Sequence, residues 1–163
     1  MRRIALLVVI LALARSAPLM AQSAEAEVLQ VVDRLFDGMR AADSAAVRSV
    51  LHPRARLVST GSRDGSPEIQ IIPIARFIDA VGGAQDKWDE LIWDPEVRID
   101  DNLATVWTQY DFHIADTFSH CGVDAFQLVR TTEGWRIISI VDTRRNEGCE
   151  GPPGADKAPS RLR

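Results

Sequence analysis

Four side chains in the C-terminal half of this 163-residue chain have the types and spacing that proton transfer requires. Trp107 and Asp111 lie in the run LATVWTQYDFHI, and His120 and Asp124 lie in the run FSHCGVDAFQLVRT. A carboxylate beside an imidazole orients the ring and raises its basicity, while an aromatic wall excludes water and raises the pKa of a carboxylate. These groups suit proton abstraction next to a carbonyl group, or elimination of water. Asp124 and His120 are therefore the candidate catalytic residues.

The register of three predicted strands decides which side chains share a face. The two runs above and a third, WRIISIVDTRR, are rich in β-branched and aromatic residues and are separated by turn-type residues at 115–117 and 132–134. Two-residue loops would put Tyr110 on the face opposite Asp124, where packing or a subunit interface is expected. A three-residue loop with a bulge would swap the faces of one strand. The first register predicts an apolar pocket whose ligand-binding residues are Phe36, Trp107, Asp111, Phe126 and Trp135.

Each polar residue also has a purely structural interpretation. Asp124 can pair with Trp107 or Arg130 across the sheet, since buried carboxylates are usually paired, and His120 near a turn is equally typical of an exposed residue. No HExxH or comparable motif accompanies Asp111 and the histidines, so we expect neither a metal nor a cofactor. The sequence also lacks GxSxG, P-loop, GxGxxG and CxxC motifs, which argues against covalent catalysis.

The two cysteines, Cys121 and Cys149, are an even pair, as expected for one disulfide in an exported protein. A turn at Glu133-Gly134 would place Cys121 opposite Asn146, with Cys149 only three residues further along. A disulfide would fasten the C-terminal tail to the edge of the sheet. The alternative, two free thiols in a reducing compartment, requires that the protein is not exported.

The first 21 residues have the pattern of a secretory signal peptide. Arg2 and Arg3 precede an apolar run that ends at Ala14, and this run is shorter than the roughly 20 residues that span a bilayer, so a retained anchor is the weaker interpretation. Removal of residues 1–21 takes away three arginines and no acid, which changes 19 basic and 23 acidic residues to 16 and 23, a net charge near −7. We therefore expect a secreted or periplasmic protein that binds no nucleic acid and, in its mature form, no membrane.

The remaining elements place helices early in the chain and strands late. The apolar periodicity predicts three helices and three further strands, and residues 148–163 are expected to be a disordered tail. Helices gathered first and a meander gathered last indicate one α+β domain. The predicted helices cover 23–42, 44–51 and 74–81, and the predicted strands that precede the meander cover 55–60, 68–72 and 88–99.

This order of elements resembles the nuclear transport factor 2-like (NTF2-like) superfamily, in particular its SnoaL-like and ketosteroid-isomerase-like branches. The resemblance lies in two helices that end at His52-Pro53-Arg54-Ala55, a third helix, and the runs LATVW, GVDAFQLVR and EGWRI. It implies a cone-shaped α+β barrel over residues 22–147, with three N-terminal helices packed on a curved antiparallel sheet. It also implies a pocket between the two layers, a homodimer through the outer sheet face and, in the enzymes, a pocket carboxylate as base.

Three functions are compatible with this pattern. The first is an exported protein that binds a small apolar or carbonyl-containing molecule in an apolar pocket. The second is an acid/base isomerase or dehydratase that uses Asp124 and His120. The third is a dimerisation or interaction module in which the protein's own side chains fill the cone. A cavity of at least ~300 Å³ would distinguish the first two functions from the third.

Overall fold

The computed structural model describes residues 17–153 of the chain. Most of the expected signal peptide and ten residues of the expected C-terminal tail lie outside this range. Within it, no helix combines the length and the apolar character that crossing a bilayer requires.

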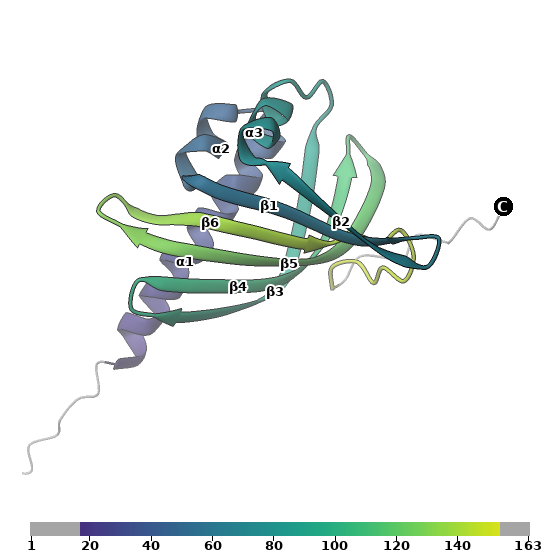
Figure 1. Cartoon of the computed structure of the whole chain (residues 1–163). Helices are drawn as coiled ribbons and strands as arrows, with labels where there is room; N and C mark the ends of the chain where they lie inside the picture. Colours follow the sequence, from purple (N-terminus) through teal and green to yellow (C-terminus); the bar gives the residue numbers. More distant parts are fainter. Residues whose placement is uncertain (1–16, 154–163) are drawn as a thin grey trace, which may run out of the picture.

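Three helices and a six-stranded sheet make up the described chain (Figure 1). The strands lie in the order β2-β1-β6-β5-β4-β3, and every neighbouring pair is antiparallel except β1 and β6, which are parallel. The α+β class and the curved sheet are confirmed, but the sheet is mixed and has two free edges, where an antiparallel barrel was predicted. The elements are α1 (Ala17–Arg40), α2 (Ser44–Val50), β1 (Leu51–Arg63), β2 (Ser66–Pro73), α3 (Ile74–Gly82), β3 (Trp88–Asp100), β4 (Leu103–Ile114), β5 (Thr117–Thr131) and β6 (Gly134–Thr143).

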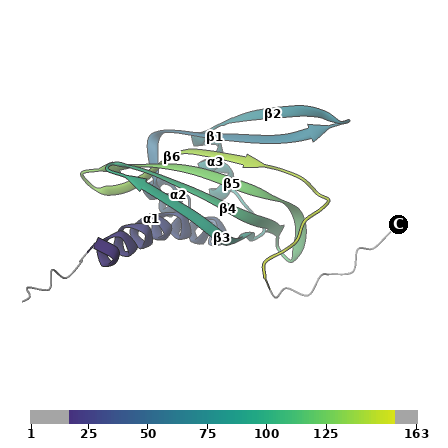
Figure 2. The ribbon, with the colours of Figure 1, turned by 90° about the horizontal axis from the view of Figure 1, so that it is seen from below.

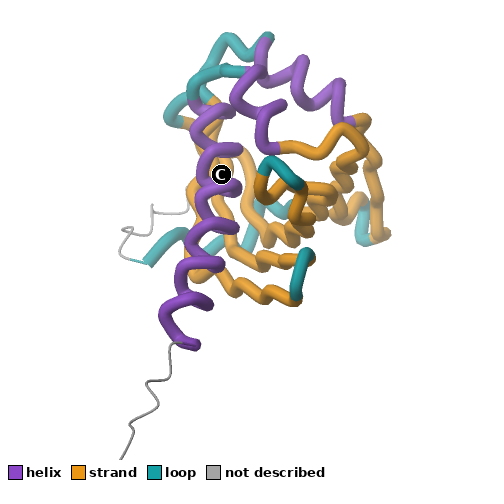
Figure 3. The backbone as a smooth tube through the Cα atoms, turned by 90° about the vertical axis from the view of Figure 1, so that its left-hand side faces the viewer, coloured by secondary structure: helices purple, strands orange, loops and turns teal. Residues whose placement is uncertain are grey.

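The helices cover one face of the sheet and leave the other face without a covering element (Figure 2). α1 crosses that inner face and contacts β3 and β6, while α2 and α3 gather at one end, as the side view shows (Figure 3). The predicted apolar stripe of α1 is buried against the sheet, with Leu35 1% and Phe36 3% exposed. Asp43 begins α2, because its carboxylate accepts hydrogen bonds from the backbone N–H groups of Ala45 and Ala46, both at 2.9 Å. Such a cap stabilises a helix by about 1 kcal/mol.

A bulge between β4 and β5 reverses the predicted face of β4. The two-residue turn is present, since Ile114 pairs with Thr117, but Phe112 then pairs with His120, and Ser119 becomes an extra residue. A single inserted residue moves the following side chains of one strand to the other face relative to its partner. The even-numbered residues of β4 therefore share the inner face with His120, and the register prediction for this strand was wrong.

A second bulge has the same effect between β5 and β6. Leu128 pairs with Ile137, but the next pair is Gln127 with Ser139, so Ile138 is skipped. This shift aligns Asp142 with Asp124 on the inner face, where the simple register placed its neighbours Val141 and Thr143.

The disulfide between Cys121 and Cys149 is confirmed, with 5.9 Å between the two Cα atoms. Cys121 faces away from the helices and forms a backbone pair with Arg145, at 2.9 and 3.0 Å. The partner is one residue before the predicted Asn146, because Thr131 pairs with Gly134, so the turn lies at Thr132-Glu133, and the bulge in β6 then shifts the partner by one residue in the opposite direction. The bond fastens the segment that follows β6 to the middle of the sheet.

Candidate functional site

A cavity of about 510 Å³ lies between the inner face of the sheet and the helices. This volume exceeds the ~300 Å³ that a small-molecule site needs, so the described side chains do not fill the cone. Most of the wall is apolar or aromatic. The aromatic lining consists of Phe36, Phe77, Trp88, Tyr110, Phe112 and Phe126, and the polar lining consists of Gln70, Arg76, Glu90, Ser119, His120, Asp124, Asp142 and Arg144.

Asp142 is fully paired within this cavity. Its Oδ1 accepts a hydrogen bond from Ser59 Oγ at 2.6 Å, and its Oδ2 accepts one from Arg144 Nε at 2.7 Å. The hydroxyl of Tyr110 lies 3.3 Å from the same Oδ2 and donates to the carbonyl oxygen of Thr143 at 2.9 Å. Burial raises the pKa of Tyr110, and the negative charges of nearby carboxylates raise it further. Tyr110 is therefore a neutral donor, and Asp142 already has its cation.

Asp124 lacks such a partner. Its side chain is 3% exposed, and within residues 17–153 its Oδ2 accepts no hydrogen bond. Its carboxyl group forms a hydrogen bond with that of Glu90 from β3, and two carboxyl groups can bond in this way only when one of them carries a proton. Glu90 is partly exposed at the cavity wall.

Burial dominates the proton affinity of this acid pair, Glu90 and Asp124. It raises the pKa of Glu90 to about 7, against the opposing effect of the hydrogen bond from Asp124. Burial also raises the pKa of Asp124 well above its ordinary value, and the negative charges of Glu90 and Asp142 add to the effect, whereas Arg144 opposes it. Both shifts favour a proton on the pair, and the more buried Asp124 is the group that holds it and donates it to the hydrogen bond with Glu90.

His120 lines the same cavity in a neutral form. Burial lowers its pKa to about 4, and the positive charge of Arg144 contributes to the decrease. Its Nδ1 lies 2.9 Å from Ser119 Oγ, and its ring packs against those of Tyr110 and Phe112, with centroid distances of 5.7 and 5.0 Å. No hydrogen bond joins His120 to Asp124 in the described part of the chain, although both residues line the cavity.

The structure brings four of the seven predicted pocket residues to one cavity. Asp124, His120, Phe36 and Phe126 line it. Among the others, Trp135 is buried in the core without lining the cavity.

The positions predicted for Trp107 and Asp111 are wrong, because the bulge at Ser119 turns both side chains to the outer face. Trp107 is 54% exposed there, and Asp111 lies opposite Cys121 rather than near His120.

One group of potential metal donors lies on the outer side of the sheet. A carboxylate oxygen of Asp111 and the sulfur atoms of Cys121 and Cys149 lie within 4.8 Å of one another. Both sulfur atoms are joined in the disulfide, and a thiolate, not a disulfide sulfur, is the metal ligand. This group is therefore not a metal centre in the oxidised protein.

The sequence pattern missed Glu90, Tyr110, Asp142 and Arg144 as members of the site. The last three were placed on the wrong face or at a strand end because bulges have no reliable sequence signature. For Glu90, the sequence does contain a pattern that indicates its position on the inner face. Trp88, Glu90 and Ile92 alternate along β3, so a carboxylate stands between two residues that face the core.

Gly122 allows the strands to approach closely beside the site. It lies between His120 and Asp124 on the inner face, and a Cβ atom at this position would collide with the carbonyl oxygen of Thr143. That oxygen accepts the hydrogen bond from Tyr110. The glycine thus admits the end of β6, and Asp142 on this strand and Arg144 directly after it line the cavity.

Three helices on a curved six-stranded sheet, with a cavity between the two layers, are the fold of NTF2-like proteins. A family model described as "Putative lumazine-binding" matches residues 23–141, and the chain belongs to this family. Comparison with curated proteins gives no match.

Solved structures show the same fold at low identity. An NTF2-like protein with a cystatin-like fold from Novosphingobium aromaticivorans is 14% identical, covers 81% of this chain and 88% of its own, and has a TM-score of 0.64. An NTF2-like protein of unknown function from Silicibacter pomeroyi is 18% identical, with coverages of 77% and 98% and a TM-score of 0.59. A "putative dehydratase" of the NTF2-like family from Streptomyces avermitilis is 12% identical, with coverages of 77% and 98% and a TM-score of 0.58. At these identities the likeness establishes the fold alone.

Proposed function

We propose that the protein is exported and binds a small molecule in the cavity between the sheet and the helices. The observation that carries this proposal is a cavity of about 510 Å³ with a mainly apolar wall, which is also lined by a few polar residues that include Asp124 and Glu90. Apolar pockets with a few convergent polar groups are the usual form of a ligand site. The description of the family as lumazine-binding supports the same kind of activity.

Export is supported by the disulfide and by the pattern of the first residues. Disulfides persist in secreted and periplasmic proteins and are rare in a reducing cytoplasm. In this proposal residues 1–21 are removed, and residues 22–147 form the functional domain. The bond between Cys121 and Cys149 then fastens the end of that domain in an oxidising compartment.

An acid/base enzyme is the second candidate, and the acid pair favours it. A protonated Asp124 beside Glu90, whose pKa is about 7, could donate and accept a proton at neutral pH. In this assignment Glu90, and not the expected His120, is the partner of Asp124. The low pKa of His120 makes its imidazole a weak base. The structural similarity to a protein described as a dehydratase is compatible with such a reaction.

Native mass spectrometry of the protein purified from its exporting host tests the binding proposal. Wild-type protein is expected to carry the mass of a small molecule. Ala80→Trp should abolish it, because Ala80 lines the cavity from α3 and a tryptophan there would fill it. Ala75→Trp, an exposed position on α3 outside the cavity lining, is the matched control and should keep it. Wild-type protein without added mass, or mass retained by Ala80→Trp, would count against the proposal.

The same material separates binding from catalysis. For an enzyme, Asp124→Asn should abolish turnover of the identified compound while the compound still binds. Equal conversion by wild type and Asp124→Asn would exclude a catalytic role for Asp124.

We also propose a homodimer through the outer sheet face. The register places Ile71, Val58, Val141, Ala125 and Trp107 in one row across five neighbouring strands. Ile71 is 73% exposed and Trp107 is 54% exposed. Apolar rows of this kind on a soluble protein commonly mark an interface. Light scattering after size exclusion should therefore give twice the monomer mass, and a monomer at high concentration would contradict the proposal.

A further inference from the structure

The acidic and basic groups around the cavity are not balanced. Three carboxyl groups line it, and Arg144 is bonded to only one of them, Asp142. The acid pair, Glu90 and Asp124, has no cation bonded to it in the described part of the chain. A buried carboxylate without a cation is costly, so the pair retains a proton.

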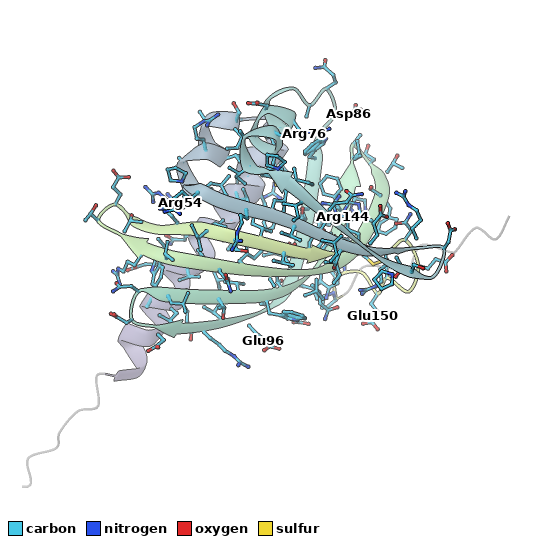
Figure 4. All side chains as sticks on the ribbon, in the orientation of Figure 1. Arg54, Arg76, Asp86, Glu96, Arg144 and Glu150 are labelled. Atoms are coloured by element: carbon cyan, nitrogen blue, oxygen red, sulfur yellow. A yellow bond between two sulfur atoms is a disulfide. The ribbon has the colours of Figure 1, made fainter. Side chains whose placement is uncertain are left out.

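Few other charged or titratable groups line the cavity with the acid pair. They are Asp142 on β6, Arg144 directly after β6, Arg76 on α3, and the neutral side chains of Tyr110 on β4 and His120 on β5. α1 contributes only apolar side chains, β1 contributes a leucine, and β2 contributes a glutamine and an isoleucine. Arg76 is an exposed residue of α3, and Figure 4 shows it apart from Arg144. The buried end of the cavity therefore has more acid than base.

Aromatic rings enclose the apolar part of the cavity. Phe36 and Phe126 meet edge to face, with ring centroids 6.1 Å apart, and Trp88 and Phe112 do so at 6.0 Å. The face of an aromatic ring attracts a cation, and the attraction is strongest where water is excluded. Aromatic rings and carboxyl groups that have no cation bonded to them both favour a positively charged ligand.

We propose that the ligand is an organic cation, a molecule with an apolar or aromatic body and a protonated amine that donates hydrogen bonds to the carboxyl groups of the acid pair, Glu90 and Asp124. This inference rests on the proposed binding function and names the class of ligand. The ammonium group takes the place of the proton held by the acid pair. Its N–H groups bond to the carboxylates, and the displaced proton leaves to solvent, so the total charge is conserved.

The alternative ligand classes fit these groups less well. A neutral carbonyl compound could accept a hydrogen bond only from a protonated Glu90, because the proton of Asp124 is already bonded to Glu90, and it would leave the charge of an ionised Glu90 unmatched. An anionic compound would face the acid pair directly at the buried end, because the guanidinium of Arg144 is already bonded to Asp142.

The pH dependence distinguishes a cation from the other classes. Raising the pH through the pKa of Glu90 makes the site more negative, so the affinity for a cation should rise by up to about tenfold per pH unit for each proton released. The affinity for a carbonyl compound, which needs the protonated acid, should fall over the same range.

Calorimetry with three matched probes tests the proposal. The probes are 1-naphthylmethylamine, 1-naphthalenemethanol and 1-naphthoic acid, which share one aromatic body and differ in charge. With the disulfide-bonded protein at pH 8 we expect the amine to bind at least about tenfold more tightly than the alcohol, and its affinity to fall at pH 6. Asp124→Asn should remove most of this preference for the amine and retain binding of the alcohol.

Asp111→Asn is the control, because it changes a buried aspartate that lies outside the cavity. Near-ultraviolet circular dichroism checks that each variant is folded, and Glu90→Gln serves if Asp124→Asn is not. Binding of the alcohol or the acid as tightly as the amine, or an amine affinity that does not change with pH, would overturn the cation proposal alone. Failure of all three probes to bind would count against the proposed binding function as well.

Discussion

The two faces of the sheet each bury an aspartate with an unpartnered oxygen, but the two aspartates have different surroundings. Asp124 on the inner face meets Glu90, and the negative charge of Glu90 adds to the effect of burial on its pKa. Asp111 on the outer face lies near His113 and Arg145, whose positive charges oppose the effect of burial. Burial alone thus does not make a functional carboxyl group. The inner face combines burial, a second acid and a cavity.

Two single-residue bulges determine which side chains lie on each face of the sheet. Without them, Trp107 would face the helices and Asp142 would face away. With them, Trp107 stands on the exposed face and Asp142 joins Tyr110 and Arg144 beside the cavity. Substitutions on either face test whether the stability and the titration of the two faces are independent.

Loss of the disulfide should have the largest effect on stability. Cys121→Ser combined with Cys149→Ser opens a loop of sequence separation 28, and the chain-entropy relation gives a loss of about 3 to 4 kcal/mol in the free energy of unfolding. Chemical denaturation measures this loss. The bond lies on the outer face, so the titration of the acid pair should be unchanged in the folded variant. A shift in that titration would show that the two faces are coupled.

Gly122→Ala should lower stability by about 1 to 3 kcal/mol, because the new methyl group collides with the carbonyl of Thr143. It should also break the hydrogen bond from Tyr110. Gln127→Ala, at an exposed position on the outer face of the same strand, is the control and should change the free energy of unfolding by no more than about 0.5 kcal/mol. A wild-type melting temperature for Gly122→Ala would refute the close approach of β5 and β6.

Stability should fall as the pH rises from about 4.5 to about 7. Because the pKa of Glu90 is raised in the folded state, the folded protein binds more protons than the unfolded chain in this window. The slope is at most about 1.4 kcal/mol per pH unit for one proton. Urea unfolding at several pH values measures the slope, and Glu90→Gln should reduce it. An equal slope in wild type and Glu90→Gln would assign the effect to other groups.

Trp107→Ser should have the smallest effect on folding and a clear effect on association. An exposed side chain contributes little to stability, so a change within about 0.5 kcal/mol is expected. Light scattering should show the dimer converted to monomer. A stable dimer in this variant would place the interface elsewhere.

The sequence was sufficient for the architecture because long elements have strong periodic patterns. The apolar stripe of α1, the stop at the end of α3 and the three C-terminal strands were all predicted. The disulfide was predicted as well, because a turn predicted at Glu133-Gly134 placed the partner of Cys121 within one residue of its observed position. These features depend on local periodicity and turn chemistry, which a single sequence contains.

The site was only partly predictable, because it depends on long-range register. The extra residue at Ser119 decides whether Trp107 or Tyr110 faces the cavity, and a bulge of this kind has no fixed residue type. Glu90 reaches Asp124 from β3, which is not adjacent to β5 in the sheet. Such a contact arises from the curvature of the sheet and cannot be derived from strand alternation.

A carboxyl-carbon NMR titration tests the central claim most directly. The account predicts that Glu90 titrates near 7 and that Asp124 titrates well above the ordinary range of an aspartate, with both signals shifting together because the two groups share a proton. Glu90→Gln and Asp124→Asn assign the two signals. If both carboxyl groups were ionised at pH 5 and titrated independently, the cavity would hold no shared proton, and the proposed site for a cation would not exist.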